Sequence, residues 1–267
     1  MERIAQAVPA EVLRRIPPIG TFAQLSMIDS MRKLAEMANR EPGNLTGVDC
    51  PKCLNRGLFY RVSDDCRRYV EECSCMAKRR SLDRIKRSGL SDLLQNYTME
   101  NWEAREPWHR KARELAERYA KDRGGWFYVA GNPGTGKTHL CTALCGMLIE
   151  KGFEVRYMLW RDVSVQAKSC VNDNDAYREI MKPLKSVQVL YIDDLFKSGG
   201  DPRDADINFA FELLNCRYND RNLLTIISSE KTVEKLMRID EAIGSRIYER
   251  SKDYYLDLSK MKNWRMQ

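Results

Sequence analysis

The sequence lacks any apolar run that approaches the roughly 20 residues needed by a membrane-spanning helix. Its opening residues, Met1-Glu-Arg-Ile, do not begin a signal peptide. Internal repeats and low-complexity tracts are also missing from the 267 residues. These absences predict an intracellular, cytoplasmic protein that does not bind a membrane.

The length leaves room for one α/β core and a smaller domain. A net charge of +7 is a modest basic excess, which suits an acidic partner without identifying one. Prolines break the first 49 residues into short helical stretches, and residues 50–75 then hold five of the nine cysteines. We place the domain boundary after residue 95, which gives an N-terminal domain over 1–95 and an α/β domain over 96–267.

The most informative stretch, residues 131–138, fits the phosphate-loop pattern G-x-x-x-x-G-K-[ST]. An apolar run at 126–130 leads into it as a buried strand, and a helical pattern at 139–151 leads out of it. Glycines let consecutive backbone N–H groups surround phosphates, and the start of the next helix stabilises the anion. We therefore predict an ATP-type triphosphate site that consists of Gly131, Asn132, Pro133, Gly134, Thr135, Gly136, Lys137 and Thr138.

Two side chains of this loop have specific roles in that prediction. Lys137 would place its charge at the β- and γ-phosphates, and the hydroxyl of Thr138 would bind Mg²⁺. The alternative is a glycine-rich turn with an unrelated lysine. The strand before the loop and the helix after it favour the phosphate site over that alternative.

The second half of the sequence alternates strands and helices in the way that parallel sheets do. A helix is expected over 204–218, where Ile207, Phe211 and Leu214 recur at helical spacing. Five strands with the phosphate loop after the first predict a doubly wound, five-stranded parallel α/β core. The strands are expected at 126–130, 154–159, 187–192, 223–228 and 253–258.

Polar residues follow two of these strands. Asp193 and Asp194 end the third, where Asp193 would hold Mg²⁺ and Asp194 would orient or deprotonate the attacking water. Paired aspartates after a strand usually cap a helix, but the phosphate loop upstream favours the catalytic interpretation. The fourth strand ends in Ser228-Ser229, and one of these hydroxyls is placed to sense the γ-phosphate.

Two arginines lie four residues apart near the end of the sequence. A helix would place Arg246 and Arg250 on one face, and such a pair usually forms a solvated surface. In an ATPase that works by assembling, one of them can reach a neighbour's γ-phosphate as an arginine finger.

Together, the phosphate loop, Leu190-Tyr-Ile-Asp-Asp194, the Ser-Ser strand end and Gly244-Ser-Arg-Ile-Tyr-Glu-Arg250 resemble a known class. They resemble the AAA+ ATPases of the DnaC/DnaI type, the bacterial and phage helicase loaders, of which the transposition helper IstB is a close relative. The resemblance covers the chain from about Tyr97 onward.

The resemblance implies Walker A at 131–138, Walker B at Asp193 and Asp194, and sensor 1 at Ser228. It places the finger at Arg246 or Arg250, with Arg250 preferred because it lies later in the motif. Walker B has Asp-Asp where many AAA+ proteins have Asp-Glu, which shortens the catalytic acid and predicts slow turnover. The 17 residues after Arg250 predict a core without the full helical lid.

The cysteines predict a zinc site ahead of this core. Their spacing, C-x₂-C-x₁₉-C-x-C, is close to that of a zinc ribbon, and the metal would substitute for a core that so short a segment cannot build. Free buried cysteines without metal are the alternative, and Cys66 is interpreted as a bystander. The predicted ligands are Cys50, Cys53, Cys73 and Cys75. By resemblance, cysteines in this place are typical of DnaI-type loaders and not of IstB.

Two further segments have weaker signals. Six bases between 78 and 87 form either a solvated helix face or a contact to phosphates or an acidic patch. An apolar stripe over 26–39, with Met27, Met31, Leu34 and Met37, is either ordinary core or a docking face.

The resemblance implies a bacterial or phage-encoded loader whose N-terminal domain binds a hexameric replicative DNA helicase. Its AAA+ domain would bind ATP and single-stranded DNA and would self-assemble through ATP-bridged interfaces. Two alternatives stay open. One is a transposition helper that acts on duplex DNA, and the other is a binding module whose ATPase activity has been lost.

Overall fold

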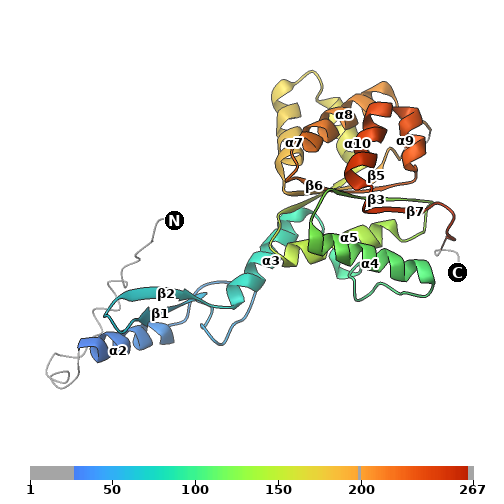
Figure 1. Cartoon of the computed structure of the whole chain (residues 1–267). Coiled ribbons are helices and arrows are strands. Elements are labelled where there is room, and N and C mark those ends of the chain that lie inside the picture. The colour runs from blue at the N-terminus through green and yellow to red at the C-terminus, as the bar shows by residue number, and fades with distance from the viewer. Residues whose placement is uncertain (1–26, 198–199, 264–267) are drawn as a thin grey trace. The chain divides into compact units, whose positions relative to one another are not determined.

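A computed structural model describes residues 27–197 and 200–263 of the chain (Figure 1). The division between its two compact units falls between Leu82 and Asp83. The boundary after residue 95 stays a prediction. None of the described helices is both long and apolar enough to cross a membrane.

The first unit contains a helix and a two-stranded antiparallel sheet. Helix α2 (Met27–Arg40) packs against strand β1 (Leu58–Val62), which pairs with β2 (Arg68–Glu72). The Asn39 side chain fixes this packing, since it donates to the Tyr60 carbonyl and accepts from the Tyr60 amide, both at 2.9 Å. The helix predicted from the apolar stripe is thus present, and its Ser26 lies outside the described residues. Cys73 and Ser74 then connect β2 to helix α3 (Cys75–Ser88).

The second unit is built on a five-stranded parallel sheet with the order β4-β5-β6-β3-β7. The predicted fold class is confirmed, and the strand bounds differ from the predicted ones by a few residues. The bounds are β3 (Trp126–Gly131), β4 (Val155–Leu159), β5 (Val189–Leu195), β6 (Leu224–Ser229) and β7 (Tyr255–Leu258).

Helices cover both faces of this sheet (Figure 1). The side chains of β3 point alternately to the two faces of the sheet, and both faces are apolar. Phe127 and Val129 lie in one apolar core. Trp126, Tyr128 and Ala130 lie in the other. The first core includes residues of α4 (Pro107–Asp122) and α5 (Lys137–Glu150), together with the short 3₁₀ helix η2 (Leu93–Gln95). The second core includes residues of α6 (Trp160–Ser169), α7 (Asn174–Ser186), α8 (Asp204–Asn219), α9 (Val233–Ile239) and α10 (Glu241–Ser251).

The strand order decides where the site forms. Strand β6 lies between β5 and β3, so the carboxyl ends of these three strands meet at one edge of the sheet. The predicted phosphate loop follows β3, and the predicted acids end β5. Residues widely separated in sequence are therefore neighbours at this edge.

Candidate nucleotide site and cysteine cluster

The phosphate loop connects β3 to α5 through two glycines in the left-handed backbone region. Gly134 has φ 79° and Gly136 has φ 80°, which L side chains rarely adopt. Gly136 caps α5, so the loop runs directly into the helix N-terminus. The predicted strand–loop–helix arrangement is present, and it provides backbone N–H groups for an anion.

Lys137 lies inside this loop and is only 5% exposed. Its ammonium donates to the carbonyls of Gly131 at 2.8 Å and Asn132 at 3.0 Å. Burial lowers the pKa of Lys137, although the nearby carboxylates of Asp194 and Glu230 oppose that shift. The lysine charge is therefore positioned within the loop.

Asp193 is brought together with the predicted magnesium ligand Thr138. The Thr138 hydroxyl lies 3.3 Å from Asp193 Oδ1, and the Asp193 side chain is almost fully buried. Tyr191 OH donates to the same carboxylate at 2.7 Å, as does Ser228 Oγ at 2.5 Å. A hydroxyl and a carboxylate held this way are oxygen ligands of the kind that Mg²⁺ prefers, so the residues fit that ion. Sequence reasoning did not identify Tyr191.

Asp194 turns away from this buried cluster. Its φ of 58° is left-handed, and its backbone amide donates to Ser228 Oγ at 2.9 Å. Its carboxylate forms an ion pair with Lys197, with Asp194 Oδ2 and Lys197 Nζ 2.7 Å apart. Lys197 also lies 3.3 Å from Glu230 Oε1, at the end of β6. No sequence motif indicated a role for Lys197 or Glu230.

The two serines after β6 hold the acidic strand end in place. Ser228 bonds to both acids, and Ser229 Oγ donates to the Leu195 carbonyl at 2.8 Å. Both serines are fully buried. The sensor role of Ser228 stays a prediction, and its observed contacts are with the Asp193 carboxylate and the Asp194 amide.

The two candidate finger arginines differ in their surroundings. Arg250 is 5% exposed, donates to the Tyr218 carbonyl at 3.1 Å and stacks over the Trp126 ring. Burial lowers its pKa. Arg246 is only partly buried, and its guanidinium lies over the rings of Phe211 and Tyr218. Arg246 also donates to Asn215 Oδ1 at 3.1 Å and to the Ala242 carbonyl at 2.8 Å. The preference for Arg250 as the finger stays a prediction, and the greater exposure of Arg246 makes it the other candidate to test.

The end of the described chain lies against the phosphate loop. Asn132 Nδ2 donates to the Ser259 carbonyl at 2.7 Å. A Cβ placed on Gly134 would lie 1.8 Å from Asn263 Oδ1, so that side chain packs directly on the glycine. A cavity of about 320 Å³ borders the same loop, and its walls include Trp102 and His139.

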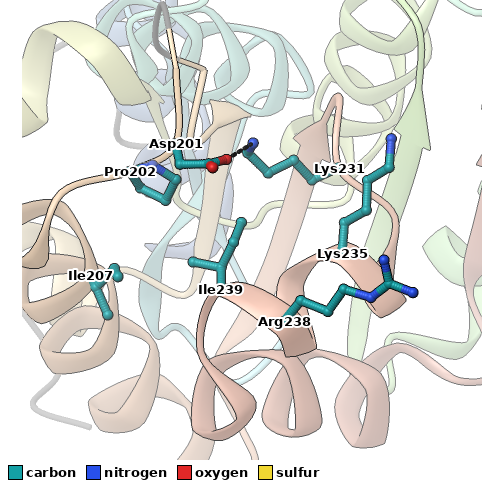
Figure 2. A pocket seen from close by; sticks show the side chains of 7 residues that line it. All are labelled: Asp201, Pro202, Ile207, Lys231, Lys235, Arg238 and Ile239. Carbon is teal, nitrogen blue, oxygen red and sulfur yellow. Dashed lines mark ion pairs between the residues drawn. The ribbon is translucent and has the colours of Figure 1, made fainter.

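A basic pocket of about 410 Å³ lies near the same edge of the sheet (Figure 2). Lys231, Lys235 and Arg238 form one side of it, and Asp201 faces Lys231 at 3.7 Å. Lys235 and Arg238 form no ion pair with any residue that the structure describes. Pro202, Ile207 and Ile239 complete the lining.

The cysteine cluster lies in the first unit. The Sγ atoms of Cys50, Cys53, Cys73 and Cys75 all lie within 4.8 Å of one another, and all four residues are buried. The sulfurs of Cys50 and Cys73 are 3.8 Å apart, and those of Cys53 and Cys75 are 3.6 Å apart. Four sulfurs around zinc at about 2.3 Å lie about 3.8 Å from one another, so the cluster fits that ion.

The thiols of the cluster share their hydrogen bonds unevenly. Burial would raise the pKa of the Cys53 thiol, but hydrogen bonds from the Gly57 amide and the neighbouring thiols outweigh it and lower the pKa to about 6. Burial, together with hydrogen bonding to the same thiols, raises the pKa of Cys75 to about 11. Cys66 has φ 59° in the exposed turn between β1 and β2 and lies outside the cluster.

The fold and the site define a P-loop ATPase of the AAA+ type. Residues 68–251 match the family described as IstB-like ATP binding protein, and the chain belongs to that family. The ATP-binding and ATP-hydrolysing class predicted from the sequence is thereby confirmed.

Three relatives show how far the similarity extends. Protein YqaM of Bacillus subtilis is 32% identical over 84% of this chain and 89% of its own length. The phage-like element PBSX protein XkdC of the same organism is 32% identical over 77% of this chain and 80% of its own. The replicative helicase loader DnaC of Escherichia coli is 30% identical over 42% of this chain, and the match spans 47% of DnaC.

Solved structures support the fold. A crystal structure of the DnaC helicase loader has a TM-score of 0.55 at 20% identity and covers 61% of this chain and 97% of its own. AMPPCP-bound DnaA from Aquifex aeolicus has a TM-score of 0.52 at 24% identity over 64% of this chain and 52% of its own.

Proposed function

We propose that this protein is an ATP-dependent loader of a hexameric replicative DNA helicase onto single-stranded DNA. The observation that carries the proposal is the 30% identity to the loader DnaC over 115 residues. The buried four-cysteine unit ahead of the core agrees with it. In this proposal the first unit binds the helicase and the second binds ATP and DNA, in the cytoplasm of a bacterium.

In the nucleotide site, Lys137 and the loop amides would hold the phosphates, and Thr138 with Asp193 would hold Mg²⁺. The ion would draw charge from the phosphate oxygens when bound. Asp194 would accept the proton of the attacking water. The cavity beside Trp102 and His139 is large enough for the nucleobase.

The basic pocket supports a contact to single-stranded DNA. Lys235 and Arg238 provide positive charge on α9, the helix that follows β6, and the apolar side chains beside them can accept sugars or bases. Lys235→Ala with Arg238→Ala should weaken binding of a fluorescent oligonucleotide and reduce the slope of log affinity against log salt by about 1.4, since each contact to single-stranded phosphate contributes about 0.7. Lys111→Ala with Lys121→Ala is the matched control, because both lysines are exposed on α4. Equal loss of affinity in both double variants would exclude the pocket as a specific contact to single-stranded DNA.

The functional test uses the purified full chain with the replicative helicase from the same source. A loader should form an ATP-dependent complex with that hexamer and place it on closed circular single-stranded DNA. The family name favours one other candidate, a transposition helper. Binding to a transposase and to duplex DNA, without helicase binding, would establish that alternative.

A further inference from the structure

Lys197 lies between two carboxylates, only one of which accepts its hydrogen bond. Its Nζ is 2.7 Å from Asp194 Oδ2, where it donates a hydrogen bond, and 3.3 Å from Glu230 Oε1. That Glu230 oxygen is buried and accepts no hydrogen bond from any group that the structure describes. Glu230 is thus a second carboxylate that pairs with the lysine by charge but does not accept its hydrogen bond.

The backbone at the lysine is held by a hydrogen bond and by buried neighbours, whereas its side chain is half exposed. The Lys197 amide donates to the Asp194 carbonyl at 2.9 Å, which closes a tight turn. Leu195 and Phe196 in this turn are buried, and Phe196 packs edge-on against Trp160. The Lys197 side chain is 47% exposed. A short rotation of that side chain can therefore exchange one carboxylate for the other.

The two positions of the lysine have different consequences for hydrolysis. An ammonium 2.7 Å from Asp194 Oδ2 occupies that oxygen and holds the carboxylate beside Lys197, so this oxygen cannot accept a hydrogen bond from the attacking water. With the ammonium on Glu230, Asp194 would be available to the attacking water. That water would transfer its proton to Asp194 while its oxygen bonds to the γ-phosphorus and ADP leaves.

We propose that Lys197 is a positioning residue that restrains Asp194, and that Glu230 receives the lysine when Asp194 is released. This rests on the proposed role of Asp194 as the proton acceptor. The lysine then sets the basal rate of ATP hydrolysis. It does so without contributing to ATP affinity.

The test measures steady-state ATP hydrolysis by the full chain without DNA or helicase, so it does not depend on the loader function. Lys197→Ala should raise kcat about fivefold at unchanged KM, because Asp194 loses its restraint. Lys197→Arg should stay near the wild-type rate, since it keeps a donor. Glu230→Gln should lower kcat, because a neutral side chain holds the ammonium less well. Lys111→Ala controls for the loss of an exposed lysine.

The double variant Lys197→Ala/Glu230→Gln decides between explanations. If Glu230 acts only by receiving the lysine, the double variant should hydrolyse ATP as fast as Lys197→Ala alone. A loss of turnover that persists without the lysine would make Glu230 itself the acceptor and overturn the proposal. A fall in kcat on Lys197→Ala would also overturn it. Wild-type turnover in Asp194→Asn would instead remove the premise that Asp194 is the base.

Discussion

Lys137 is the residue whose change should affect ATP binding most directly. Lys137→Ala removes the charge next to the β- and γ-phosphates, so ATP affinity should fall about tenfold or more and ATP-dependent assembly should be lost. Titration with a fluorescent ATP analogue measures the affinity. Circular dichroism should show an intact fold, because the sheet and its helices do not depend on the two loop carbonyls that lose the ammonium as a donor. Unchanged affinity would remove the phosphate-loop assignment.

Asp194 should separate binding from hydrolysis. Asp194→Asn keeps Asp193 and Thr138, so ATP and Mg²⁺ should still bind, while turnover falls about 100-fold or more through loss of the proton acceptor. Release of inorganic phosphate measures the rate, and analogue binding provides the control. Turnover at the wild-type rate would show that a residue other than Asp194 is the proton acceptor.

Residues of the nucleotide site differ in how far the sequence reveals them. The phosphate loop is contiguous, so its spacing alone predicts its backbone. Asp193 could be placed because a carboxylate at the end of a buried strand must face the same edge as the loop. The roles of Lys197 and Glu230 could not be predicted from the sequence. Their proximity depends on β5 and β6 being neighbours and on the left-handed backbone at Asp194. Neither requirement leaves a pattern in the sequence.

The first unit should depend on its metal. Among the residues of this unit that the structure describes, the buried cluster consists of the four cysteines, with Phe59 and Met76 packed against them. So small a core cannot stabilise α2 and the β1–β2 hairpin by itself, so the free energy of zinc binding would have to supply the rest of the folding free energy. We expect about one zinc per chain by elemental analysis, and loss of helicase binding after chelation with ATP binding retained.

Variants give this prediction a control inside the same unit. Cys73→Ser with Cys75→Ser should lower the zinc content severalfold, because an alcohol is a poor ligand at neutral pH. Cys66→Ser should leave it unchanged, since that thiol is exposed and outside the cluster. Full zinc content in the double variant would exclude the site.

Secondary structure was predictable where burial is complete. The three central strands of the large sheet, β3, β5 and β6, are buried along almost their whole length, so they stand out as mainly apolar runs. The hairpin of the first unit was not predicted, because every residue of β2 is exposed and the strand has no apolar alternation. Cross-strand pairing and the adjacent cysteines specify it instead.

Assembly through ATP-bridged interfaces is the prediction that concerns the whole molecule. If Arg246 completes a neighbour's site, Arg246→Ala should bind ATP normally and lose turnover. Mixed with Asp194→Asn, it should recover activity, because some interfaces then combine an intact finger with an intact acid. Activity no greater than the sum of the separate variants would show that Arg246 does not act across an interface.

Arg250 serves as the comparison in that experiment. Its guanidinium is buried against Trp126 and bonds to the Tyr218 carbonyl. Arg250→Ala should therefore lower the free energy of unfolding by about 1–3 kcal/mol, because buried acceptors lose their donor. Thermal unfolding measures this loss. A variant of unchanged stability that complements Asp194→Asn would identify Arg250 as the finger.

The chain after β7 has a practical consequence for following ATP binding. Asn263 packs on Gly134, and the Ser259 carbonyl accepts a hydrogen bond from Asn132. Lys262 lies between these contacts and is exposed. A fluorophore attached at position 262 would lie next to the phosphate loop without replacing any residue of it. Such a probe would report nucleotide occupancy in real time with unlabelled ATP.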